Sequence, residues 1–215
     1  MRSVGRCILT LQEVSSLQDD PELPGWEVIH KHDDYCAILI PSELSGNIRW
    51  TDRTIRTSSV ILGELGVIGA YLADSGKNFI EFEHSLVELD AAITKILQAG
   101  AKVLAICGDL QVQLEPNIRG CTGPDALGKG TDKESTCHRR ALLMRTTKKF
   151  GLKAANTWLC GRPCYTHKPW QDGTPNKQLD YILVSRSLHA ESQVPNASRM
   201  QERFGSLIIF RQSAS

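Results

Sequence analysis

The sequence has almost no net charge, because 25 lysine and arginine residues balance 24 aspartate and glutamate residues to within +1. Such a chain has no overall field that attracts a polyanion, so affinity for nucleic acid would require a local basic patch. A long apolar run is also absent. The least polar stretch, residues 58–73, contains Glu64 and three glycines. We therefore expect no membrane-spanning helix and no association with a membrane.

We also expect no apolar secretory leader, since residues 1–5 are too short and too polar to form one. The seven cysteines are scattered and odd in number, which is typical of reduced thiols inside a cell. We expect an intracellular protein, nuclear or cytoplasmic and not secreted. The ordinary globular composition, with 41% hydrophobic residues, favours one domain over residues 1–185, followed by an irregular tail over residues 186–215.

The stretch 102–111, K-V-L-A-I-C-G-D-L-Q, is the centre of the predicted fold. Val103 to Cys107 form an unbroken apolar run that Gly108 ends, which is typical of a strand buried on both faces. Asp109 then lies at the carboxyl end of this strand, where open α/β sheets place their ligands. A buried carboxylate there requires a cation or hydrogen-bond donors. The alternative is that Asp109 only caps the following turn.

Two other predicted strands also carry an acid near one end. Residues 7–11 are followed by Gln12 and Glu13, and the run 178–185 contains Asp180. Three strands that each deliver a carboxylate can build a divalent-cation site, because Mg²⁺ prefers oxygen ligands and takes only one or two protein carboxylates. We therefore expect Glu13, Asp109 and Asp180 to converge at one mouth between two packed sheets.

Four motifs occur in the order L-Q-E, G-D-L-Q, N-T-W and Q-L-D-Y-I-L-V-S. This order resembles the endonuclease/exonuclease/phosphatase family, especially the endonuclease domains of retrotransposon-like elements, from about Cys7 to Ser185. The resemblance implies an α/β fold, a four-layer α/β sandwich of two mostly antiparallel sheets flanked by helices. It also implies a magnesium- or manganese-dependent hydrolase, a metal-binding and DNA-binding nuclease that cleaves phosphodiesters.

The resemblance also implies roles for the motif residues. Glu13 would bind the metal, and Asp109 would bind the metal and orient the attacking water. Asp180 would orient a histidine, and Tyr71 would reach the scissile phosphate, although Tyr71 also fits a half-packed tyrosine at a strand end. Gln111 takes the place of an asparagine that contacts phosphate or metal.

Three further residues match family segments beside the substrate groove. Asn156 and Trp158 belong to N-T-W, and His167 belongs to the C-Y-T-H-K-P-W segment, which also contains Trp170. Indole rings can stack on nucleobases, so Trp158 and Trp170 are candidate groove residues. Buried packing of Trp158 is the alternative.

Three departures from the family pattern predict weak or lost activity. The first strand, which carries an asparagine, is missing, Gln111 replaces another asparagine, and no terminal Asp-His pair follows Ser185. His189 lacks the preceding aspartate, so we do not assign it a catalytic role. Because each lost group commonly costs a hundredfold or more, the alternative function is a catalytically inactive binding or vestigial domain of mobile-element origin.

Periodicity predicts helices over residues 79–99 and 136–150 and a strand that begins at Ala155. The second helix has a basic face that we expect to lie in water or on a phosphate backbone, formed by Arg139, Arg140, Arg145, Lys148 and Lys149. Residues 41–51 and 113–134 read as loops. Cys121, Cys137 with His138, Cys160 and Cys164 leave a zinc module as a further alternative, although their spacings match no closed four-ligand site.

Overall fold

A computed structural model describes residues 7–15, 22–74, 76, 78–130, 132–158, 165–167, 177–187 and 206–211. The strands are β1 (Cys7–Gln12), β2 (Trp26–Ile29), β3 (Cys36–Pro41), β4 (Ile48–Arg53), β5 (Thr57–Leu62), β6 (Leu65–Tyr71), β7 (Val103–Asp109), β8 (Leu152–Ala154), β9 (Asp180–Ser185) and β10 (Ser206–Arg211). The helices are α1 (Ser42–Ser45), α2 (Phe79–Gln98), α3 (Glu134–Lys149) and the 3-10 helix η1 (Ala155–Thr157).

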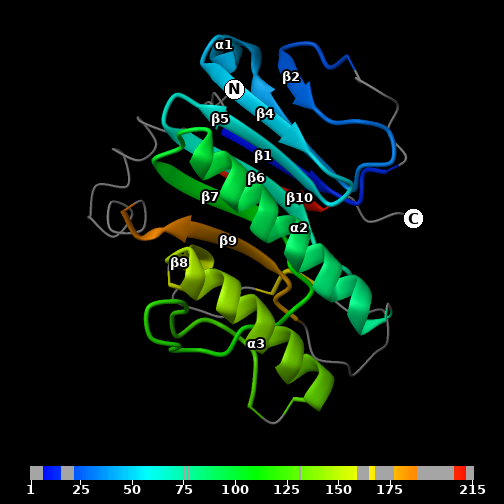
Figure 1. The fold of residues 1–215 in the computed structure, drawn as a ribbon, viewed down its shortest axis with the longest axis vertical. Coiled ribbons are helices and arrows are strands. Elements are labelled where there is room, and N and C mark those ends of the chain that lie inside the picture. Colours follow the sequence, from blue (N-terminus) through cyan, green and yellow to red (C-terminus); the bar gives the residue numbers. More distant parts are fainter. Residues whose placement is uncertain are drawn as a thin grey trace.

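The strands form two sheets that pack on each other (Figure 1). The first has the order β10-β1-β3-β2, and the second has the order β4-β5-β6-β7-β9-β8. Within the described strands, β10–β1 and β6–β7 are parallel and every other pair is antiparallel. The predicted α/β fold with two mostly antiparallel sheets is therefore confirmed. Central strand β7 continues past the apolar run Val103–Cys107 to Asp109, which lies at its carboxyl end as predicted.

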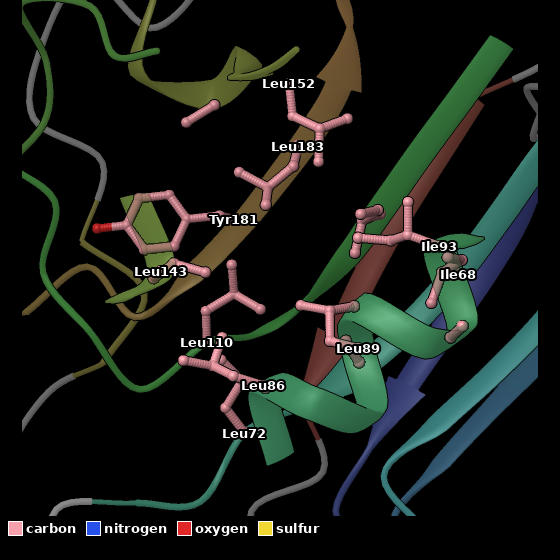
Figure 2. Close-up of a cluster of buried hydrophobic side chains, with 14 of the residues drawn as sticks. Ile68, Leu72, Leu86, Leu89, Ile93, Leu110, Leu143, Leu152, Tyr181 and Leu183 are labelled. Carbon is pink, nitrogen blue, oxygen red and sulfur yellow. The ribbon is translucent and has the colours of Figure 1, made fainter. Parts of the chain in front are cut away.

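Two apolar layers hold these elements together. Between the sheets lie β-branched and aliphatic side chains such as Ile8, Ile38 and Val67, which have no more than 3% of their surface exposed. The second layer lies between the six-stranded sheet and the helices. There the apolar stripe of α2 packs beside residues from β9 such as Tyr181 (Figure 2). Burial on this scale stabilises by about 25 cal/mol for each Å² of apolar surface removed from water.

The helix α2 begins where the sequence predicts. The Asn78 side chain accepts a hydrogen bond from the Glu81 amide at 2.9 Å, which satisfies one of the free donors of the first turn. Gly100, with φ of +99°, follows its C-terminal end, as expected of a residue that stops a helix in the left-handed region. Leu97, near the end of this helix, is 40% exposed.

We expected five basic residues of α3 to form an exposed face, and this prediction is wrong for two of them. Arg139 and Arg140 are 6% and 4% exposed, and both donate hydrogen bonds to loops within the protein. The charge of these side chains predicts that they are exposed. Their burial is favourable only because carbonyl and carboxylate groups from distant segments bind them, and the local sequence does not show those partners. Arg145 and the two lysines are exposed, as expected.

The C-terminal segment differs from the predicted irregular tail. Residues Ser206–Arg211 form β10, which pairs in parallel with all of β1 from Cys7 to Gln12. Strand β1 therefore has β10 on one side and β3 on the other. A domain boundary at residue 185 stays a prediction.

Two other local predictions are wrong. The segment expected to be a loop over residues 41–51 contains α1 and most of β4, whose alternation with charged residues is typical of an edge strand. The strand that we expected to begin at Ala155 is absent from that position. Strand β8 lies before it, at Leu152–Ala154, and residues Ala155–Thr157 form η1. Among the helices that the structure describes, none has the length and apolar character needed to cross a bilayer.

Candidate active site

Three of the predicted site residues, Tyr71, Asp109 and Asp180, form a row across adjacent strands, which we call the acidic row. Tyr71 at the end of β6 pairs with Asp109 at the end of β7, and Asp109 pairs with Asp180 at the start of β9. Residues directly opposite each other in a sheet project their side chains from the same face. The three side chains therefore leave the six-stranded sheet together, at the end nearest Glu13.

Glu13 reaches this row from the other sheet. It follows β1 with φ of +61°, a left-handed conformation that turns the chain at the strand end. The Tyr71 hydroxyl donates a hydrogen bond to Glu13 Oε1 at 3.3 Å. Burial and the nearby charges of Glu13 and Asp109 raise the pKa of Tyr71 above its ordinary value, so its hydroxyl stays protonated at neutral pH.

The carboxylate of Asp109 is fully buried and is held by Gln111. Asp109 Oδ1 accepts from the Gln111 amide at 3.1 Å, and Oδ2 accepts from Gln111 Nε2 at 2.6 Å. Gln111 itself has φ of +55°. Asp109 thus caps the turn after β7 and also lies in the acidic row, so both expectations for this residue describe part of its environment.

The backbone around Asp180 is fixed by two neighbouring side chains. Asn156 Nδ2 donates to the Asp180 carbonyl at 3.0 Å, and Asn156 Oδ1 accepts from the Ile182 amide at 3.2 Å. Thr166 Oγ1 accepts from the amides of Leu179 and Asp180 at 2.9 and 3.0 Å. The described contacts of Asn156 therefore orient β9, and its predicted role in substrate binding stays a prediction.

The two other predicted groove residues lie near this end of the sheet. Trp158 is half-buried, and Lys153 Nζ lies 5.6 Å from the centre of its ring. Gly123 packs so closely on Trp158 that a Cβ there would lie 2.7 Å from ring atom Cδ2. His167 pairs with Lys177 through two backbone hydrogen bonds at 3.0 and 2.9 Å. Trp170 and His189 lie outside the described residues.

Sequence reasoning missed two residues beside Tyr71. The Tyr35 ring stacks on the Tyr71 ring with a centroid separation of 5.3 Å. The Arg56 guanidinium lies 5.1 Å from the Tyr35 centroid and 6.0 Å from the Tyr71 centroid. This places a cation next to the acidic row, where it can attract an anionic ligand. No local pattern marks Tyr35 or Arg56, because three different segments meet to form the cluster.

The donors at this site are of the kind that Mg²⁺ prefers. Glu13, Asp109 and Asp180 offer carboxylate oxygens, and Mg²⁺ needs only one or two of them beside water and phosphate. Next to Glu13, the Gln12 carboxamide is fully buried, and among the described residues neither of its polar atoms has a hydrogen-bond partner, which is consistent with a ligand or water nearby.

Within the described ranges, however, no group of three or more histidine, cysteine, aspartate or glutamate residues is arranged to hold a metal. This finding applies equally to zinc at Cys121, Cys137 and His138. The Cys137 thiol instead donates to the Asp132 carbonyl at 3.4 Å. Cys160 and Cys164 lie outside the described residues. Any Mg²⁺ would therefore depend on water and phosphate oxygens for much of its shell.

Comparison with known proteins supports the fold. No family model and no curated protein matches the chain. Solved structures do match it over 85% of its length: the 3′ phosphatase NExo from Neisseria bound to product DNA hairpin has 18% identity and a TM-score of 0.56 over 77% of that chain. The 3′-5′ exonuclease NExo from Neisseria meningitidis has 18% identity and a TM-score of 0.55 over 78% of its length. An AP endonuclease from Archaeoglobus fulgidus has 14% identity and a TM-score of 0.56 over 77% of its length. The chain therefore has the fold of the endonuclease/exonuclease/phosphatase family.

Proposed function

We propose that the chain is an intracellular, divalent-metal-dependent phosphodiester hydrolase of the endonuclease type, which acts on DNA with low activity. One observation carries the proposal: Glu13 from one sheet meets the Tyr71 hydroxyl from the other, in line with Asp109 and Asp180. The likeness in fold to a phosphatase bound to a DNA hairpin supports the choice of substrate.

Each residue has a distinct task in this proposal. Glu13 and Asp109 would hold Mg²⁺ or Mn²⁺, which supplies charge neutralisation at phosphorus when it is bound. Once Glu13 binds the metal, the protonated Tyr71 hydroxyl would donate its hydrogen to a phosphate oxygen in place of Glu13, and Arg56 adds positive charge beside it. Asp180 would add a third carboxylate beside Asp109. The low activity follows from Gln111, because both Asp109 oxygens already accept its hydrogen bonds and are weakened as acceptors for a water proton.

Metal-dependent nicking of supercoiled plasmid DNA tests the proposal. We expect slow nicking with Mg²⁺ or Mn²⁺ that stops when the metal is chelated. Glu13→Gln keeps the size of the side chain and removes its charge, so the rate should fall about a hundredfold. Glu83→Gln, at an exposed position of α2, is the matched control and should nick at the wild-type rate. Nicking that survives Glu13→Gln would remove Glu13 from the mechanism, and no nicking by the wild type would favour a binding or vestigial domain.

Shortening Gln111 should raise the activity. Gln111→Asn removes the 2.6 Å hydrogen bond from Nε2 to Asp109 and keeps the hydrogen bond from the backbone amide of residue 111. Asparagine also tolerates the φ of +55° well. A hydrogen bond to a charged group contributes about 1.5–3 kcal/mol, so we expect a roughly tenfold faster nicking rate. Gln98→Asn, exposed near the end of α2, should have no effect. An unchanged or slower rate for Gln111→Asn would show that Gln111 does not restrain Asp109.

A further inference from the structure

The neighbouring residues Arg139 and Arg140 of α3 are both buried, and each holds a different loop. Arg139 Nη1 donates to the carbonyl oxygens of Ala73 and Asp74, both at 2.9 Å. Its guanidinium also lies 4.7 Å from the centre of the Phe82 ring. The two carbonyls lie two and three residues after Tyr71, where the chain leaves β6. Arg139 therefore fixes the exit of the strand that carries the site tyrosine.

Arg140 makes the equivalent contacts on the segment that follows β7. Its Nε donates to the Gln113 carbonyl at 2.6 Å, and its Nη1 donates to the Lys129 carbonyl at 3.1 Å. The same guanidinium forms ion pairs with Glu115 and Asp132. Gln113 lies two residues after Gln111, which holds Asp109. Arg140 thus fixes the long loop just beyond the site carboxylate.

The segments that follow β6 and β7 are also connected by hydrogen bonds, the first to the end of β7 and the second to β9. The Leu72 amide donates to the Asp109 carbonyl at 3.0 Å, so the segment after β6 is bonded to the end of β7. The Leu114 amide donates to the Tyr181 hydroxyl at 2.9 Å. Since both arginines belong to one helix, a shift of α3 would move both exits at once.

We infer that Arg139 and Arg140 are positioning residues that set how Tyr71 and Asp109 lie relative to each other. The guanidinium suits this role, because its planar set of donors can bond several carbonyl and carboxylate oxygens in fixed directions. A displacement of a fraction of an ångström at a reacting group is enough to lower a rate substantially. The catalytic part of this inference rests on the proposed function, whereas the effect on the loops does not.

Hydrogen exchange of the full-length chain without metal tests the effect on the loops. Arg139→Lys and Arg140→Lys keep the charge but lose the planar donors, and Arg145→Lys on the exposed face of α3 is the matched control. We expect at least roughly tenfold faster exchange over residues 72–74 for Arg139→Lys and over 110–115 for Arg140→Lys. If Arg140→Lys does not fold, Asp132→Asn weakens the same contact from the loop side. Unchanged exchange, or a uniform increase across both sheets, would overturn the inference.

Kinetics of plasmid nicking test the catalytic part. For both variants we expect kcat to fall about tenfold while KM changes less than about twofold, because substrate contacts stay and only the reacting groups shift. Arg145→Lys should match the wild type. Locally faster exchange with an unchanged kcat would overturn the positioning role. If the wild type does not nick DNA, the proposed function fails, and the exchange experiment still decides whether the two arginines hold the loops.

Discussion

Replacing Asp109 with asparagine is expected to lower the rate of metal-dependent DNA nicking by about a thousandfold. Asp109 is fully buried between Tyr71 and Asp180 in the strand register. The substitution keeps its shape but removes the charge that would hold a cation and orient water. Steady-state nicking at saturating Mg²⁺ measures the effect, with circular dichroism to show that the variant folds.

Asp52→Asn is the matched control for this experiment. Asp52 lies on the edge strand β4 and forms an ion pair with Lys95 at 2.8 Å, away from the acidic row. The loss of a surface ion pair costs about 1 kcal/mol or less, so nicking should be unchanged. Equal rates for Asp109→Asn and the wild type would contradict the assignment of Asp109.

Gly108→Ala is expected to destabilise the protein by about 4 kcal/mol, which is a large fraction of the roughly 5–15 kcal/mol by which native proteins are stable. A Cβ at Gly108 would lie 1.9 Å from the Ala70 carbonyl oxygen, which belongs to the backbone of the neighbouring strand β6. Because backbone cannot rotate away as a side chain can, β6 and β7 would have to separate at the residues that lead into Tyr71 and Asp109. Urea unfolding measures the loss as a lower midpoint.

Gly46→Ala provides the comparison for the unfolding experiment. A Cβ at Gly46 would have no atom within 4 Å, and its φ of −62° suits any residue. Its free energy of unfolding should stay within about 0.5 kcal/mol of that of the wild type. If Gly108→Ala unfolds at the same urea concentration as Gly46→Ala, the close approach of β6 and β7 does not require glycine.

The parts of the fold that depend on local pattern could be predicted from the sequence. The apolar run of β7 and the helical spacing of α2 each report the burial of one segment, and the strand ends then indicate where Tyr71, Asp109 and Asp180 lie. The partners in space could not be predicted. The burial of Arg140 depends on carbonyls from residues 113 and 129, and the stack of Tyr35, Tyr71 and Arg56 joins three segments.

The same limit applies to the roles of the site residues. Asparagine and glutamine differ by one methylene, yet that length lets Gln111 reach back to Asp109, which no motif comparison indicates. Asn156 matches a family motif, but its carboxamide bonds the backbone of β9 on both sides. Roles assigned by resemblance stay predictions until the variants above are measured.

The pairing of Cys7 with Ser206 delays the completion of the smaller sheet during synthesis. A ribosome that adds about 5–20 residues per second needs about 10–40 s to travel between these positions. During that time, β1 has no partner on one side and exposes unpaired amides and carbonyls along an edge that favours aggregation. We therefore expect the nascent chain to depend on chaperones, and a variant that ends before β10 to accumulate in the insoluble fraction of cells.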